Sequence, residues 1–178
     1  MSIDQIRNQI ERIKDNESKL YSYLYDLTYQ EISPNVRFLE TIYSRFLEDK
    51  RTEIKRVAIY CLLFGLQIRK SEYKKVAFTE LKNKFGDFDL RLSCASGLAQ
   101  AYFATDDKDL FSVFYSIFND QDEDEGIRSE CFIGMMKVHG MNSTEILEKN
   151  LNKIIMSVDD LFLENFEQEI DEIKGLIQ

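Results

Sequence analysis

The sequence predicts an all-α protein of about ten helices, and three observations support this fold class. One proline and seven glycines among 178 residues are too few for the many tight turns of an all-β fold. Apolar residues recur at helical spacing along most of the chain. The chain also resembles itself at intervals of 36 and 37 residues. Together these features predict a right-handed α-solenoid of about five antiparallel helical hairpins.

The internal similarity comes from three windows whose apolar or small residues superimpose. A period of this length is typical of stacked two-helix units, each of which buries its apolar face only against its neighbours. An alternative stays open, because 36 residues are ten helical turns and keep unrelated amphipathic helices in phase. The aligned positions are Ile54/Leu90/Ile127, Ala58/Cys94/Cys131, Leu62/Leu98/Met135, Phe78/Phe114/Leu151 and Leu81/Ile117/Ile154.

The first helices follow from local signals. Ser2 and Gln5 form a capping-box pattern, and Ile3, Ile6, Ile10 and Ile13 then follow as an apolar stripe. A second helix is expected over 17–31. Ser33 and Pro34 suit the N-cap and first position of a third helix.

Later helix starts are predicted from capping residues, and two glycines are placed as helix stops. Asn142 and Ser157 have the capping-box partners Glu145 and Asp160. The other starts are Thr52, Ser71, Asp89 and Asp107, and the stops are Gly86 and Gly140.

We expect one domain over residues 1–178. It divides into divergent N-terminal helices (1–49), three repeats (50–156) and a C-terminal capping segment (157–178) whose helix is expected over 158–175. Divergent ends suit a stacked array because its terminal units face water.

Two windows, residues 89–99 and 126–135, resemble the first helix of HEAT-like repeats. The pattern of that helix has an acidic residue near the start, an apolar–Arg pair, small residues three and four positions on and a close that contains Leu. Lys55 replaces the arginine in the first unit, and Phe132 replaces a small residue in the third. The resemblance implies a curved α-solenoid that binds other macromolecules, and it does not imply a reaction. It also implies structural roles for Arg91 and Arg128, whose equivalents bond to loop acids.

Composition favours a folded cytoplasmic protein. Apolar residues make up 44% of the chain and charged residues 31%, which is ordinary for a globular domain. The start lacks the apolar run of a signal peptide. The longest apolar stretch, 57–66, is about half the ~20 residues needed to span a bilayer. Three widely spaced cysteines suggest neither disulfides nor a zinc site.

Charge is distributed unevenly. Residues 1–86 carry 16 Lys+Arg against 12 Asp+Glu, net +4, and residues 87–178 carry 7 against 20, net −13. Acids concentrate in 120–130 and 157–178, and bases in 50–84. These charges could be solvated helix faces and helix-start acids, or an acidic surface that docks a basic protein.

The candidate partner-binding residues are exposed acids and tyrosines. The tyrosines follow at i, i+4 and i+8 beside a leucine face, so they are covered by the first helix or form an interface anchor. The full set is Asp120, Asp122, Asp124, Glu125, Glu164, Glu167, Asp171, Tyr21, Tyr25 and Tyr29.

No catalytic motif stands out. His139 is the only histidine and suits a helix C-terminus. Residues 120–131 begin like a calcium loop, but Glu125 and Cys131 occupy the positions that need Gly and a bidentate Glu. We therefore expect no enzyme activity, no cofactor and no metal.

These features predict a non-enzymatic protein-binding module. The preferred hypothesis is an immunity or antitoxin protein that neutralises a basic toxin, such as a nuclease, as a monomer or weak dimer. The alternative is a scaffold or regulatory adaptor that holds a peptide or protein in its groove. A third alternative is an enzyme that resembles the HEAT-like DNA alkylation-repair glycosylases. The acidic pI of about 4.8 and the absence of tryptophan disfavour this alternative. The acidic pI also disfavours nucleic-acid binding in general.

Overall fold

The computed structural model describes residues 2–29 and 36–178, and of Tyr29 it describes only the backbone. These residues form ten α-helices and contain no β-strand. The predicted all-α class is confirmed. The helices are α1 (Ile3–Ile13), α2 (Glu17–Tyr29), α3 (Val36–Tyr43), α4 (Thr52–Tyr60), α5 (Ser71–Lys82), α6 (Phe88–Ala101), α7 (Lys108–Phe118), α8 (Glu125–Val138), α9 (Ser143–Lys149) and α10 (Glu167–Ile177).

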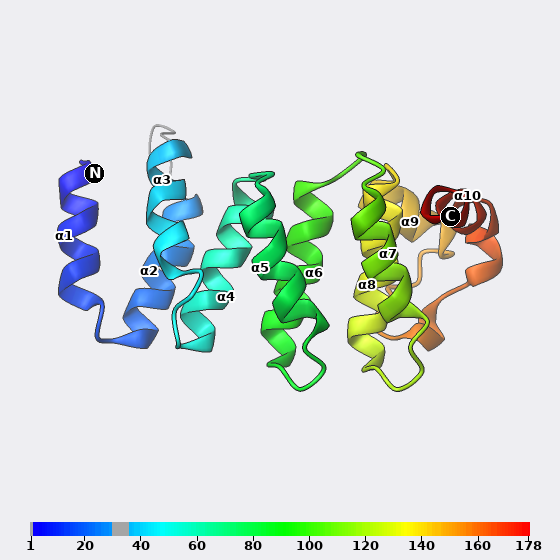
Figure 1. Ribbon diagram of the computed structural model, residues 1–178, viewed down its shortest axis with the longest axis horizontal. Helices are drawn as coiled ribbons and strands as arrows, with labels where there is room; N and C mark the ends of the chain where they lie inside the picture. Colours follow the sequence, from blue (N-terminus) through cyan, green and yellow to red (C-terminus); the bar gives the residue numbers. More distant parts are fainter. Residues whose placement is uncertain (1, 30–35) are drawn as a thin grey trace.

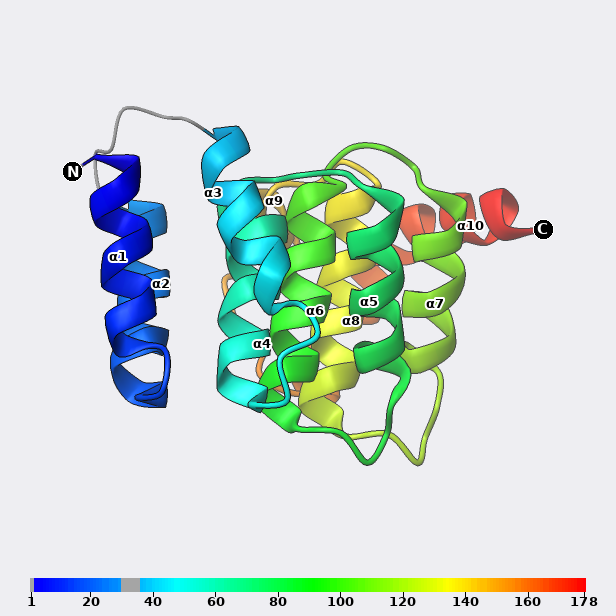
Figure 2. The same cartoon turned by 60° about the vertical axis from the view of Figure 1, so that its left-hand side comes forward.

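The helices follow one another along the long axis of the molecule in nearly the order of the sequence (Figure 1). Helices α2, α4, α6 and α8 form one layer, in which each packs against the next. Helices α3, α5 and α7 form a second layer in front of it (Figure 2). Helix α5 packs most closely on α6, and α7 on α8. Helices α5 and α7, each the second helix of a predicted repeat, therefore pack on the first helix of the next repeat.

The core runs through the layer of α4, α6 and α8, where the helices approach closely. The aligned positions Ala58, Cys94 and Cys131 are all fully buried. A Cβ atom on Gly97 would lie 3.0 Å from the Cβ of Leu63, and one on Gly134 would lie 2.8 Å from the ring of Phe114. The absence of a side chain at Gly97 and Gly134 therefore lets the backbone of α6 and α8 pack directly against the side chains of Leu63 and Phe114.

Most predicted helix signals are present in the structure. The Ser2–Gln5 and Asn142–Glu145 capping boxes form, and Asp107 caps α7. Gly140 follows α8 with φ +108°, a conformation that favours glycine. The predicted start at Asp89 is wrong by two residues, since Asp87 accepts a hydrogen bond from the N–H of Leu90 and caps α6.

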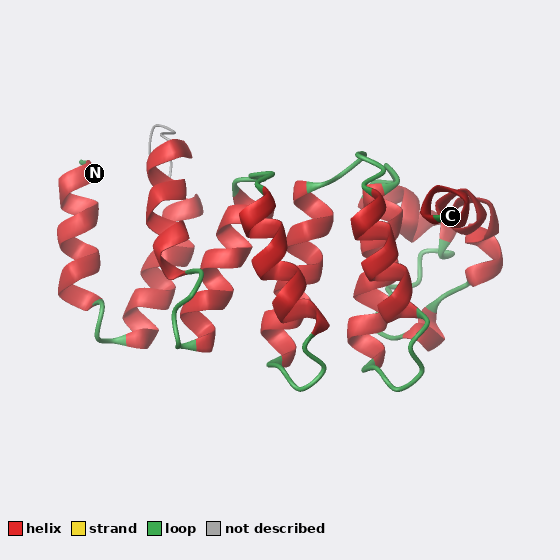
Figure 3. Cartoon of the chain, viewed as in Figure 1, coloured by secondary structure: helices red, strands yellow, loops and turns green. Residues whose placement is uncertain are grey.

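Other boundaries differ or lie outside the described residues. Thr52 and Ser71 are the first residues of α4 and α5, whose N-cap residues are Arg51 and Lys70. The start predicted at 33–34 falls outside the described residues, and α3 is described from Val36. All secondary structure in the described residues is helix, turn or loop (Figure 3).

The third repeat departs from the predicted alignment. Leu151 and Ile154 were matched with core residues of the preceding units, but their side chains are 63% and 70% exposed. Helix α9 has already ended at Lys149, and Leu151 and Asn152 have φ values of 54° and 61°. This left-handed backbone cannot continue a helix.

The expected single helix over 158–175 is also wrong. The chain forms 3₁₀ turns at Val158–Asp160 and Leu163–Phe166 before α10 begins. The amide of fully buried Asn150 explains the break. Its Nδ2 donates to the carbonyls of Lys153 and Asp160, and its Oδ1 accepts from the N–H of Phe162. These bonds hold the segment in an irregular path around α8.

Candidate protein-binding surface

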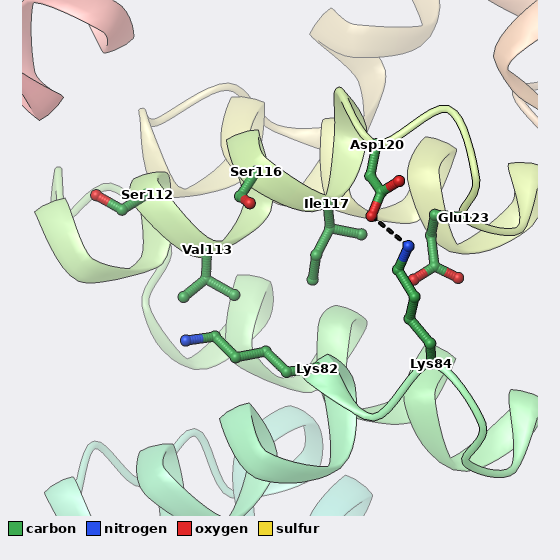
Figure 4. A pocket seen from close by; sticks show the side chains of 8 residues that line it. All are labelled: Lys82, Lys84, Ser112, Val113, Ser116, Ile117, Asp120 and Glu123. Carbon is green, nitrogen blue, oxygen red and sulfur yellow. Dashed lines mark ion pairs between the residues drawn. The ribbon is translucent and has the colours of Figure 1, made fainter.

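Two interhelical loops lie side by side at one end of the helices, the α5–α6 loop (83–87) and the α7–α8 loop (119–124), along the lower edge of Figure 1. An ion pair joins them, with 2.5 Å between Lys84 Nζ and Asp120 Oδ2 (Figure 4). The hydrogen bond from Lys84 lowers the pKa of Asp120.

A second ion pair attaches the α7–α8 loop to α6. Arg91 of α6 donates from Nη1 and Nη2 to the two carboxylate oxygens of Glu123, at 2.9 and 2.5 Å. Its Nε donates to the carbonyl of Leu81. Both charged side chains are 4% exposed. Burial raises the pKa of Glu123, but the hydrogen bonds from Arg91 and the Asp124 N–H outweigh it and leave the pKa below its usual range.

Two phenylalanines are exposed at the same end of the molecule. The side chain of Phe85, at the tip of the α5–α6 loop, is 99% exposed, and Phe88, the first residue of α6, is 45% exposed. Exposed apolar residues are common on proteins, but a fully exposed aromatic side chain forgoes about 1.5–3 kcal/mol of burial. Large aromatic side chains in this setting are typical anchors for a protein partner.

A cleft of about 510 Å³ lies between the two loops and is lined by Phe85 and Phe88 on one side and by Asp122 and Asp124 on the other. Asp124 caps α8 with its Oδ1, which accepts from the N–H groups of Gly126 and Ile127. A Cβ atom on Gly126 would lie 3.1 Å from both Asp124 Oδ1 and Phe88 Cζ. The carboxylate and the ring therefore border the same space.

We call the exposed residues of this end the loop-end surface. Asp122, Asp124 and Glu125 are exposed there. Met156, 74% exposed, extends the surface, since its carbonyl accepts from Ser129 Oγ on the first turns of α8. The surface consists of Phe85, Phe88, Asp122, Asp124, Glu125 and Met156.

The other predicted acids lie elsewhere. Glu164 belongs to the turn before α10, and Glu167 and Asp171 belong to α10 itself. Helix α10 lies near the upper ends of the other helices, whereas the 119–124 loop lies at their lower ends (Figures 1 and 2). Asp171 pairs with Lys174 at 3.1 Å. The two acidic segments of the sequence thus form separate surfaces.

The predicted tyrosines lie near the N-terminal end of the molecule, on α2. The rings of Tyr21 and Tyr25 stack with centroids 6.3 Å apart, and the row continues through Tyr60 and Phe64 at 6.1 and 4.8 Å. Tyr25 is 38% exposed, while the side chain of Tyr29 lies outside the described residues. These tyrosines do not join the loop-end surface.

The basic middle of the sequence pairs mainly with acids of neighbouring elements. Lys55 bonds to Glu80, and Lys74 bonds to Asp107. Lys70 pairs with Glu40. Because of these pairs, fewer lysines of the 50–84 segment are available to a ligand than the count of bases in the sequence suggests.

His139 is the C-cap residue of α8. Its Nδ1 lies 3.0 Å from Asp106 Oδ1, and its Nε2 lies 3.0 Å from Glu172 Oε2. The imidazole therefore links the α6–α7 loop to α10. Among the described residues, no group of three or more His, Cys, Asp or Glu side chains is placed to hold a metal ion.

Sequence reasoning missed Phe85, Phe88 and Met156. Helical periodicity indicates which apolar residues share a face, but it says nothing of apolar residues in loops or at a helix's first position. The available signal was an aromatic residue before Gly86, inside a segment predicted as a turn.

No helix in the described part of the chain has the length and apolar character to cross a membrane. Comparisons with protein-family models, curated proteins and solved structures give no match to this chain.

Proposed function

We propose that this chain is a non-enzymatic protein-binding module, built as a short right-handed α-solenoid of HEAT-like repeats, that binds a basic protein through its loop-end surface. The observation that carries the proposal is the nearly complete exposure of Phe85 beside exposed carboxylates. An aromatic anchor surrounded by acids suits a partner that presents an apolar pocket within a basic surface.

The charge distribution supports this choice of partner. Because the helices are arranged nearly in chain order, the net charges of +4 for residues 1–86 and −13 for 87–178 are separated along the molecule. A strongly acidic half accelerates encounter with a basic protein and orients it during approach. All residues of the loop-end surface except Phe85 belong to that half.

Among basic partners we favour a toxin, such as a nuclease, which the chain would neutralise as an immunity or antitoxin protein of the cytoplasm. A nuclease must attract phosphates, so its binding face is cationic. An acidic protein can cover such a face without any catalytic residue of its own. The small size of the chain suits one-to-one neutralisation.

The test is affinity capture of the tagged protein at low salt from its own organism, followed by elution with rising salt and mass spectrometry. We expect one basic protein in near-equal amount, which is toxic when expressed alone. Repeating the capture with Asp122→Lys/Glu125→Lys should abolish it. Glu167→Lys/Asp171→Lys makes the same charge change on α10 and should leave it intact. Capture that survives the loop-end variant but fails with the α10 variant would contradict the proposal.

A second function has one specific observation in its favour. A groove of about 350 Å³ lies between α5 and α7, with Val113 and Ile117 as its apolar part and Lys82 on its α5 side (Figure 4). Ser112 and Ser116 supply hydroxyl groups along α7. A scaffold or adaptor could hold an extended peptide there. Ser116→Trp fills the groove, so it should block an adaptor's partner and leave a loop-end partner bound.

A further inference from the structure

The cleft at the loop-end surface contains carboxylates without a cationic partner. Among its charged residues, Lys84 is paired with Asp120, and Arg91 with Glu123. Asp122 and Asp124 make no ion pair within the described residues. Asp124 uses one oxygen to cap α8, which leaves Oδ2 available. The helix start contributes only about half a positive charge, so the cleft has an excess of negative charge.

The opposite side of the cleft is aromatic. Phe85 and Phe88 line it with their exposed rings. The face of a phenylalanine ring attracts a cation within about 6 Å of its centroid, and a guanidinium group is bound more often than an ammonium group. Arginine also stacks flat on a ring while its N–H groups bond to a carboxylate.

From these two walls we infer that the cleft is a receptor for a single arginine side chain of the partner. The guanidinium would stack on Phe88 and donate to Asp122 and to the free oxygen of Asp124. The environment of Gly126 shows that ring and carboxylate are near each other, because a Cβ atom there would lie 3.1 Å from both Phe88 Cζ and Asp124 Oδ1, the oxygen that caps α8. The inference rests on the proposed function for its biological partner, but it is tested without that partner.

The probe is a fluorescein-labelled Gly-Arg repeat peptide, compared with Gly-Lys and Gly-citrulline peptides of equal length by fluorescence anisotropy. Citrulline keeps the planar shape of arginine but lacks its charge. We expect the arginine peptide to bind about two- to fivefold tighter than the lysine peptide, which is the range that a cation–π contact at an exposed site gives. The citrulline peptide should not bind.

Three variants test the two walls. Phe88→Leu keeps the apolar bulk at the start of α6 and removes the aromatic face, so the preference for arginine over lysine should fall to about one. Tyr25→Leu, a matched loss of an exposed ring on α2, should leave the preference unchanged. Gly126→Ala favours the helix but places a methyl group between ring and carboxylate, and it should weaken arginine binding.

Equal affinity for arginine and lysine peptides, or an unchanged preference in Phe88→Leu, would overturn the inference. In ¹⁵N-labelled protein, amide shifts at Phe85, Phe88 and 122–125 support the cleft, and shifts confined to α10 overturn it. If no peptide binds while Asp122→Lys/Glu125→Lys still abolishes capture of the partner, the arginine receptor is refuted and the proposed function is not. Arginine-selective binding without any captured partner would refute the proposed function alone.

Discussion

Arg91 and Glu123 form a bidentate ion pair across 32 residues of sequence, with both side chains only 4% exposed. The pair fixes the α7–α8 loop against α6. Because it removes Glu123 from the surface, it also decides which acids of the 120–125 segment can meet a partner.

Replacing Arg91 with Ala should destabilise the protein strongly. The substitution leaves the carboxylate of Glu123 buried without its partner, and loss of one member of a buried pair costs about 3–5 kcal/mol. For a protein of this size that corresponds to roughly 6–20 °C in melting temperature. Thermal denaturation followed by circular dichroism measures the change. A shift below 2 °C would show that the pair has no structural role.

Arg128→Ala should have a smaller effect. Its Nε donates to the carbonyl of Phe118, as that of Arg91 does to Leu81, each ten residues earlier in the chain. Arg128 makes no ion pair with a carboxylate in the described residues, so its loss leaves one buried carbonyl unsatisfied at a cost of about 1–3 kcal/mol. Both variants should still bind the partner at a temperature where they are folded. A larger loss for Arg128→Ala than for Arg91→Ala would contradict this comparison.

Acid should weaken the attachment of the α7–α8 loop. The pKa of Glu123 is lower in the folded protein than its ordinary value of 4.5. Its stabilisation is therefore complete above pH 4.5 and is lost as the pH falls through the lowered folded value. Urea denaturation from pH 7 to pH 3 should show this loss. Glu123→Gln should flatten the acid limb of the profile, and an unchanged limb would assign it to other carboxyl groups.

The three thiols should be unreactive in the folded protein. Cys61, Cys94 and Cys131 are fully buried. Burial raises the pKa of Cys61 to about 11 and also raises the pKa values of Cys94 and Cys131. Since the thiolate is the reactive form, Ellman's reagent at pH 8 should label none of them in native protein and all three in guanidinium. Rapid labelling of native protein would show that the core opens.

Asn150→Ala should loosen the C-terminal segment. The side chain is fully buried and makes three hydrogen bonds, to Lys153, Asp160 and Phe162. The substitution removes the hydrogen-bond partner of these three backbone groups. Each group that stays buried without a partner lowers the free energy of unfolding by about 1–3 kcal/mol. Hydrogen exchange should accelerate over 150–162 but not in α4 or α6. Asn165→Ala, which removes a single bond to the Lys149 carbonyl, is the milder control, and equal effects would argue against the role of Asn150.

Local sequence signals predicted most of the helices because they act within one or two turns. The capping boxes at Ser2 and Asn142 and the stop at Gly140 each depend on residues within four positions. The buried positions Ala58, Cys94 and Cys131 followed from helical period alone. Where the chain leaves regular helix, as at Leu151, an alignment based on that period no longer applies.

The sequence by itself determined the all-α class, the order of the helices and the excess of acid in the second half, because each depends on composition or on short-range spacing. The tertiary structure decided which charges remain free and which apolar residues stay in water. Asp122 and Glu123 are adjacent in sequence, yet Glu123 is buried in its pair with Arg91 and Asp122 is exposed beside the phenylalanines. That difference depends on contacts between loops and helices some thirty residues apart, which no local pattern encodes.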